Sequence, residues 1–400
     1  MKRIIAGLLA LPLLLTSAEA SALPEQSPLF EASFLQGWYC RDWTASQWQT
    51  EFADMMAAGF RSVIIQSAVD LTYAQTDAAA RKTDIGSYQL TDSAALLPTA
   101  LVPGSEGQQA LGSALRAAKE TGLTVWIGTV SDSRWWNYGW GEPESDLTAW
   151  SEQNAAQCST LIREIWEQFG GEFNEQIAGF YYNNEIWNFS TESDTYAAVI
   201  GQNIRKMLDA AESLCPEKPL MISPFFNRDL TDSAAYADLW RAIASYAKFR
   251  SYDVFAHQDG GGRDYDSDTI REWADALHGA VGGQMRFWIN NETFGTDSGA
   301  KAPEKLRESY LATSQAEKHI LFSWNHYYHG TLDAEFAKLI QSMTGDLNGD
   351  GACTVADAVT LHRWLMHDRI TVANWRAGDL DGNGILNAAD FTLLKRRLLS

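Results

Sequence analysis

The stretch AGFYYNNE at positions 178–185 decides the fold. A short apolar run ends in three polar residues, a pattern typical of a buried strand that opens onto a polar edge. Seven more runs of this kind occur, at residues 34–39, 62–66, 124–129, 220–223, 254–257, 286–289 and 320–323. Helix-like stretches alternate with them, for example at 48–58, 111–121, 159–169, 196–214 and 306–317. This alternation predicts an α/β fold, a (β/α)8 TIM barrel. A doubly wound open sheet competes, although no glycine-rich phosphate fingerprint follows the first strand.

Chemistry in such a barrel belongs at the carboxyl ends of the strands. Glu185 follows the fourth strand and Glu292 the seventh, so their carboxylates can face each other across the mouth. Glycoside hydrolysis needs such a pair, one to protonate the leaving oxygen and one to attack or to activate water. We therefore predict Glu185 and Glu292 as the catalytic residues. Aromatic, amide and charged side chains near the strand ends are predicted to bind a sugar: Gln66, Trp136, Asn183, Asn184, His257, Gln258, Asp259, Trp324, Asn325 and His326.

Near the C-terminus, DLNGDG at 346–351 recurs as DLDGNG at 379–384, 33 residues later. Each segment resembles the loop of an EF-hand, in which oxygens at alternate positions converge on Ca²⁺ and a glycine makes the sharp turn. Aspartate stands at the twelfth position in place of the usual glutamate. The predicted ligands of the first loop are Asp346, Asn348, Asp350, Ala352, Thr354 and Asp357, and those of the second are Asp379, Asp381, Asn383, Ile385, Asn387 and Asp390. Ala352 and Ile385, at position 7, contribute only their backbone carbonyl oxygens, and Thr354 and Asn387 stand at position 9.

Both loops continue into a single apolar helix, DAVTL at 357–361 and DFTLL at 390–394. With this feature the segment resembles a type I dockerin, a small all-α module. The resemblance implies folding on two Ca²⁺ ions and docking onto a cohesin module of a scaffoldin, as in cellulosomes. It also implies that positions 10 and 11 of each loop meet the cohesin, here Val355, Ala356, Ala388 and Ala389.

The larger domain resembles the clan of retaining barrel glycosidases. Asn184 and Glu185 match the Asn-Glu pair that ends strand 4, with the glutamate as acid/base. Glu292 matches the nucleophile, and Trp324 the aromatic floor of the sugar site. More closely, the domain is similar to an uncharacterised family of barrel proteins regarded as glycosidases, through FLQ at 34–36, WIG at 126–128, ISPF at 222–225, QDG at 258–260, ETF at 292–294 and NHY at 325–327.

The N-terminus resembles a secretory signal peptide, because Lys2 and Arg3 precede an apolar run and Ala18-Glu19-Ala20 suits cleavage. The domains expected are a signal peptide at 1–20, the barrel at 21–343 and the dockerin at 344–400. The product is then secreted, extracellular, and bound to a cellulosome or cell surface. The mature chain carries 29 basic and 50 acidic residues, which disfavours nucleic acid and anionic membranes as partners. No later stretch is long and apolar enough for membrane insertion.

The resulting prediction is a glycoside hydrolase acting on a plant or microbial polysaccharide, with no cofactor for catalysis. Glu185 should have a raised pKa in less polar surroundings, and Glu292 should be held ionised by hydrogen bonds. Two alternatives stay open: a barrel that binds polysaccharide or a partner without cleaving it, and a metal-dependent lyase or esterase using His257, His326 and His329. The four cysteines are expected to be mostly free, and the two modules to pack together because no Pro/Thr-rich spacer separates them.

Overall fold

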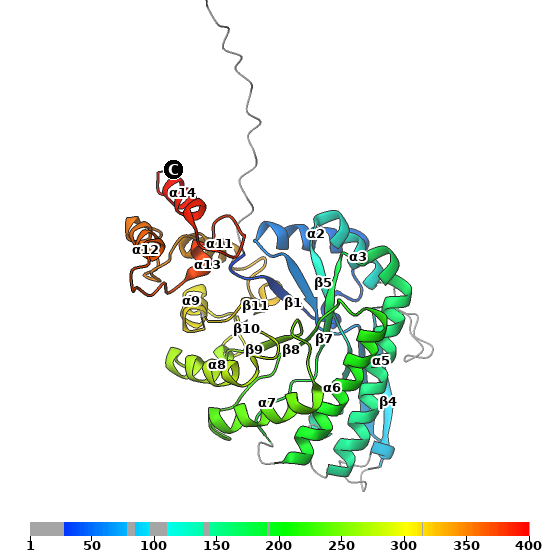
Figure 1. Ribbon diagram of the computed structural model, residues 1–400. Helices are drawn as coiled ribbons and strands as arrows, with labels where there is room; N and C mark the ends of the chain where they lie inside the picture. The colour runs from blue at the N-terminus through cyan, green and yellow to red at the C-terminus, as the bar shows by residue number, and fades with distance from the viewer. Residues whose placement is uncertain are drawn as a thin grey trace, which may run out of the picture.

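The structure is a computed structural model that describes residues 28–77, 85–96, 110–138, 144–189, 193–313 and 315–399; the predicted signal peptide lies outside these ranges. Eight parallel strands close into a barrel in the order β1-β11-β10-β9-β8-β7-β5-β2 (Figure 1). They are β1 Ala32–Leu35, β2 Ser62–Ile65, β5 Thr124–Gly128, β7 Ile177–Tyr182, β8 Leu220–Ile222, β9 Val254–Gln258, β10 Arg286–Glu292 and β11 Lys318–Phe322. The predicted (β/α)8 barrel is confirmed.

Helices surround the barrel as an outer layer (Figure 1). They are α2 Ala45–Ala57, α3 Ala110–Thr121, α5 Glu144–Phe173, α6 Asp194–Leu214, α7 Ser233–Ala247, α8 Ser267–Val281, α9 Pro303–Ala312 and α11 Asp333–Met343. Side chains alternate along each strand between the barrel interior and this layer. The interior is filled by bulky residues such as Phe34, Trp126, Tyr181 and Trp288. This alternation decides which strand-end residues can reach a ligand.

The first strand differs from the prediction. It spans Ala32–Leu35 in place of 34–39, and residues Gly37–Cys40 form the short helix α1. The ladder to β2 ends where Leu35 pairs with Ile65. A Cβ at Gly37 would lie 3.0 Å from the carbonyl oxygen of Ser67, so the chain turns at a glycine in close contact with the next loop.

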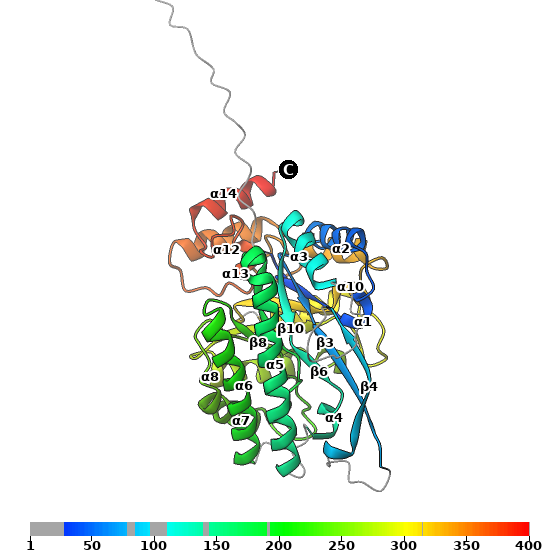
Figure 2. The ribbon, with the colours of Figure 1, turned by 90° about the vertical axis from the view of Figure 1, so that its right-hand side faces the viewer.

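A second sheet was not predicted. Strands β3 Val69–Gln75, β4 Tyr88–Ala95 and β6 Val130–Asp132 form a three-stranded sheet in the order β4-β3-β6, on the lower right of the barrel in Figure 2. β4 is mostly exposed, so its sequence lacks the apolar run that marked the barrel strands. The short helix α4, Trp135–Tyr138, follows β6.

The C-terminal module contains α12 Val355–Leu365, α13 Trp375–Gly378 and α14 Ala388–Arg397. Its small core consists of Leu347, Leu361, Leu380, Leu386 and Leu394. In both ribbon views the module lies on the opposite side of the barrel from β4 (Figures 1 and 2).

The module packs against the barrel, in agreement with the sequence analysis. Arg376 donates from Nη2 to the carbonyl oxygen of Ala316 at 2.6 Å. Arg397 donates to the carbonyl oxygen of Gln341 at 3.0 Å, and Ala377 is part of the barrel's own core. Because Ala316 precedes β11, the module lies at the amino ends of the strands, away from the barrel mouth.

The four cysteines are free, as expected, and Cys40, Cys158 and Cys215 are buried. Among the helices of the described ranges, none has the length and apolar character needed to cross a membrane.

Candidate active site and metal loops

Glu185 lies just beyond the carboxyl end of β7 and is half-buried. Burial raises the pKa of its carboxyl group to about 7, and a hydrogen bond from Gln258 acts in the opposite direction. That contact is long, at 3.5 Å between Gln258 Nε2 and Glu185 Oε1. The raised pKa agrees with the prediction for a general acid, which must carry a proton near neutral pH.

Glu292 is the last residue of β10 and is 8% exposed. Its Oε2 accepts a hydrogen bond from the backbone N–H of Gly262 at 2.6 Å. Burial raises the pKa of Glu292, and the charge of Asp259 raises it further, whereas the Gly262 bond and Lys301 lower it. The prediction that hydrogen bonds hold Glu292 ionised is therefore corrected, because desolvation and a like charge outweigh them in the free protein.

The two carboxyl groups belong to one electrostatic site. The charge of Glu185 contributes to the raised pKa of Glu292, which requires that the two side chains interact. The end of β9 and the loop after it contact the two residues, since Gln258 of β9 contacts Glu185 and Gly262 of the loop contacts Glu292. When two carboxyl groups disfavour each other's ionisation, the pair retains one proton more readily than either group alone would.

The structure corrects two predicted substrate contacts on strand ends. Asn184 is 5% exposed, and its Nδ2 donates to Asn154 of α5 and to the hydroxyl of Tyr182, at 2.9 and 2.7 Å. His257 is 1% exposed and its ring lies 5.3 Å from that of Phe226, in the layer between strands and helices. Burial lowers the pKa of His257 to about 3, so this ring is neutral. Both residues occupy the outward-facing phase of their strands.

Three further predicted contacts serve the scaffold. Asp259 is 1% exposed and accepts hydrogen bonds from the N–H groups of Gly261 and Glu292 and from Asn291 Nδ2. Trp324 is 2% exposed and stacks on the ring of His329 at 4.3 Å.

Asn325 is 4% exposed, and its Nδ2 donates to Glu51 of α2. Trp324 and Asn325 lie in the short helix α10, Trp324–Tyr327, which turns them away from the mouth.

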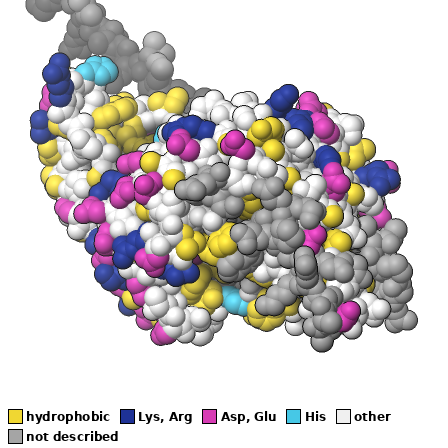
Figure 3. Space-filling view, turned by 90° about the horizontal axis from the view of Figure 1, so that it is seen from below, with side chains coloured by type: hydrophobic (Ala, Val, Ile, Leu, Met, Phe, Trp, Pro, Cys, Tyr) yellow, Lys and Arg dark blue, Asp and Glu magenta, His cyan; other side chains and the backbone are white. Residues whose placement is uncertain are grey.

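The other predicted contacts remain available to a ligand. Asn183 is half-buried, and its Oδ1 has no hydrogen-bond partner among the described residues. Gln66 and Trp136 line one cavity beside the three-stranded sheet. His326 is half-buried at the rim. Figure 3 shows the molecule from below, the end toward which β4 and α4 extend in Figure 2. Hydrophobic side chains and a histidine are exposed together in the lower part of that view.

Two contributors were missed in the sequence. Lys301 is 9% exposed and its charge favours ionised Glu292. The pKa of Tyr327 is raised by burial and by the charge of Glu292, which places this phenol near the carboxylate. Lys301 stands in a polar loop without any pattern that marks it. Tyr327 was part of a recognised motif but was not singled out.

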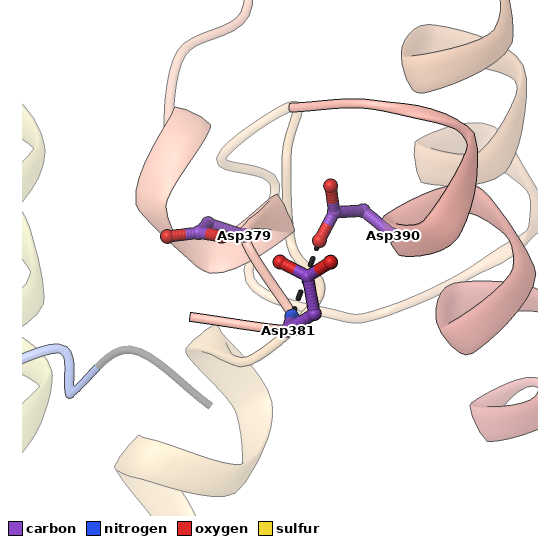
Figure 4. A group of neighbouring side chains, drawn as sticks. All are labelled: Asp379, Asp381 and Asp390. Carbon is purple, nitrogen blue, oxygen red and sulfur yellow. Dashed lines mark hydrogen bonds between the residues drawn. The ribbon is translucent and has the colours of Figure 1, made fainter. Parts of the chain in front are cut away.

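In the second metal loop, Asp379, Asp381 and Asp390 offer carboxylate oxygens that lie within 4.8 Å of one another. They come from the end of α13, the loop and the start of α14 (Figure 4). Such a set of hard oxygen donors fits Ca²⁺. Among the described residues, no comparably close group of three forms in the first loop.

The two loops nevertheless share one hydrogen-bond plan. Asp346 accepts from the N–H groups of Asp350 and Gly351, as Asp379 accepts from those of Asn383 and Gly384. Burial, with the charges of two neighbouring aspartates, raises the pKa of Asp346, as expected where carboxylates are crowded to receive a cation.

The predicted ninth-position ligands have another role here. Thr354 Oγ1 accepts from the N–H of Ala356 at 3.2 Å, and Asn387 Oδ1 accepts from Ala389 at 2.7 Å. Both are therefore N-caps, of α12 and α14. In EF-hands the ninth position often ligates through water, which this capping role permits, so Thr354 and Asn387 stay predicted ligands.

The fold and the site together define a (β/α)8 barrel with an acidic pair at its mouth, followed by a small module with two EF-hand-like loops. Residues 31–332 match the family described as a domain of unknown function, DUF4434, and the chain belongs to that family. Residues 344–399 match the type I dockerin domain, so the C-terminal module is a dockerin.

Solved structures show the same barrel fold. A candidate α-L-fucosidase from Bacteroides thetaiotaomicron superposes with a TM-score of 0.58 at 15% identity, over 82% of this chain and 98% of that one. A β-galactosidase from the psychrophilic Marinomonas ef1 gives a TM-score of 0.50 at 11% identity, over 87% of this chain and 61% of that one. Identities this low relate the folds alone. No curated protein sequence matches the chain.

Proposed function

We propose that this chain is a secreted glycoside hydrolase that acts on polysaccharide by the retaining two-glutamate mechanism, with Glu185 as general acid/base and Glu292 as nucleophile. The observation that carries the proposal is the shared site of these two residues. Glu292 ends β10 and Glu185 follows β7, both contact the end of β9 or the loop after it, and the charge of Glu185 affects the pKa of Glu292.

The reaction requires the proton to move between the two carboxyl groups, because in the free protein the pKa of Glu292, about 8, lies above that of Glu185, about 7. The reactive form needs one proton, on Glu185, and an ionised Glu292. A pair that shares a single proton near neutral pH includes that form. Positive charge develops on the sugar ring in the transition state, which favours ionised Glu292, and Lys301 and the N–H of Gly262 assist in the same direction.

The dockerin is proposed to bind two Ca²⁺ ions and to attach the enzyme to a cohesin. The residues expected to meet the cohesin are not covered by the barrel. Val355 is 70% exposed, and Val359 and Met366, which lie farther along the same helix, are 52% and 65% exposed. Ala388 and Ala389 are exposed as well. The domain limits 1–20, 21–343 and 344–400 belong to this proposal.

The test is hydrolysis of a panel of plant and microbial polysaccharides by the calcium-loaded chain, with reducing ends as the readout. We expect Glu185→Gln and Glu292→Gly to lose activity while cohesin binding stays intact. Glu335→Gln, in α11 beside the dockerin, is the control and should retain both. Full activity of Glu292→Gly would refute the assignment. Binding of a polysaccharide without released ends would favour the non-catalytic barrel.

A further inference from the structure

The cavity lined by Gln66 and Trp136 is a groove at the barrel mouth, between the loop after β1 and the three-stranded sheet. Its volume is about 440 Å³, and the residues that line it include Gln36, Trp38, Gln66, Asp70, Arg41 and Trp136. Two tryptophans with large exposed surfaces mark it, Trp38 at 57% and Trp136 at 55%. Such rings are normally buried in a folded protein, and a pair of them around one groove indicates a ligand with apolar faces.

The groove floor is polar and rigid. Asp70 accepts a hydrogen bond from Ser67 Oγ at 2.5 Å. A side chain at Gly37 would meet Ser67 Oγ at 3.2 Å and Asp70 Oδ2 at 3.3 Å, so the absence of a side chain there keeps this part of the groove open. Amide and carboxyl groups beside flat rings form the combination that binds sugar hydroxyls and ring C–H faces together.

A belt of rings connects the groove to the acidic pair. Trp38 contacts the ring of His326 edge-on at 5.0 Å, and His326 contacts Tyr327 at 5.8 Å. Tyr327 stacks on Phe294 at 5.5 Å. A Cβ at Gly262 would lie 2.4 Å from the Phe294 ring, and the N–H of Gly262 binds Glu292. The belt therefore runs along the rim without interruption from Glu292 to Trp38.

We infer that this groove is a distal subsite for a neutral polysaccharide chain, with Trp38 and Trp136 as its platforms, and that the chain extends along the rim from the acidic pair. The link to cleavage rests on the proposed function; binding in the groove does not.

A neutral ligand is favoured over an anionic one. The mature chain has 21 more acidic than basic residues by sequence, so a polyanion would be repelled on approach. Within the groove, burial raises the pKa of Asp70, and another anionic group beside it would add to that cost. Arg41 is the positively charged residue of the groove, and its Nε lies 3.7 Å from Asp42 Oδ2, so its charge already has an acidic partner and does not call for an anionic ligand.

The experiment is affinity electrophoresis of the full calcium-loaded chain in gels that contain glucomannan, mixed-linkage β-glucan, xyloglucan or arabinoxylan, with polygalacturonate as the anionic comparison. All samples carry Glu292→Gln so that the polymer is not degraded. We expect retardation by at least one neutral polymer, and a Kd about tenfold higher or more in the Trp38→Ala/Trp136→Ala double variant. Tyr246→Ala removes an aromatic side chain that is 39% exposed on α7, and should bind as the parent does.

The outcomes separate the two proposals. Retardation that depends on Trp38 and Trp136 supports the subsite even if no polymer is cleaved, in which case only the hydrolase proposal fails. The subsite proposal is overturned if the parent and the double variant are retarded equally. It is also overturned if no neutral polymer retards the parent, or if polygalacturonate alone does. With Glu292 restored, the double variant should lose activity on the polymer but not on a short aryl glycoside, which cannot reach the groove. Equal losses on both would also overturn it.

Discussion

Arg376 is predicted to join the dockerin to the barrel. It is 9% exposed, its Nη2 donates to the carbonyl oxygen of Ala316 at 2.6 Å, and its guanidinium lies 4.9 Å from the centre of the Trp375 ring. The hydrogen bond to Ala316 comes from a charged group and contributes roughly 1.5–3 kcal/mol, whereas the cation–π contact lies within the dockerin and does not hold it to the barrel. Burial lowers the pKa of Arg376, which shows that desolvation offsets part of this gain. We therefore expect Arg376→Ala to weaken the contact by about 2 kcal/mol.

Hydrogen exchange followed by mass spectrometry measures this effect directly. A loss of about 2 kcal/mol should speed exchange roughly 30-fold in peptides that cover 374–380, where local opening limits exchange. Arg363→Ala is the matched control. Its partner Asp368 is 2.9 Å away, but the two side chains are 54% and 47% exposed, so the pair contributes little. Unchanged exchange at 374–380 in Arg376→Ala, or an equal change in Arg363→Ala, would refute the reasoning.

Three other predictions concern the metal, the proton and the loop after β9. Removing calcium with a chelator, or replacing Asp390 by Ala, should reduce the helical circular dichroism signal and abolish cohesin binding. The dockerin core is small, so metal ligation supplies much of the folding free energy of this module. Unaltered cohesin binding after chelation would contradict this prediction. Activity should give a bell-shaped pH profile, because the reactive pair holds one proton, and should fall above about pH 8, where the pair loses that proton. Gln258→Ala should move the profile to higher pH, because the hydrogen bond that it removes lowers the pKa of Glu185; a shift to lower pH would refute this role of Gln258. Gly262→Ala should reduce kcat at least about 100-fold, because the new Cβ would lie 2.4 Å from the Phe294 ring and displace the N–H bound to Glu292. Gly279→Ala, with open space at the Cβ, is the control and should be active. Equal activity of the two variants would contradict the role of the Gly262 N–H.

The sequence was sufficient for the barrel and for its two acidic residues. Parallel strands in a barrel place their carboxyl ends at one face, so a glutamate at the end of β7 and one at the end of β10 had to reach the same mouth. The two EF-hand-like loops were equally predictable, because the residues that form each loop lie within 12 consecutive positions and need no tertiary information.

The substrate contacts were less predictable, because a shift of one position reverses the direction of a side chain. Asn184 and His257 stand next to residues that face the mouth but point toward the helices themselves. Trp324 and Asn325 turn away because a short helix follows β11, which no local signal announced.

Long-range effects were invisible in the sequence. Burial, and the charge of Asp259 at a distance of 33 residues along the chain, raise the pKa of Glu292, which is the opposite of the ionisation expected from the sequence. The sheet made by β3, β4 and β6 escaped detection because β4 is mostly exposed, β3 is only partly buried and β6 has three residues, so none of them shows a long apolar run. The groove between Trp38 and Trp136 was missed with it.

One measurement tests the roles of the two glutamates together. In Glu185→Gln, an activated aryl glycoside needs no acid to leave, so Glu292 should still be glycosylated, whereas hydrolysis of the covalent intermediate should slow without the general base. After a rapid acid quench, peptide mass spectrometry should show one sugar residue added to Glu292. If the wild-type protein releases sugar from that glycoside while the variant carries no adduct, or carries it on another residue, the two-glutamate account is wrong.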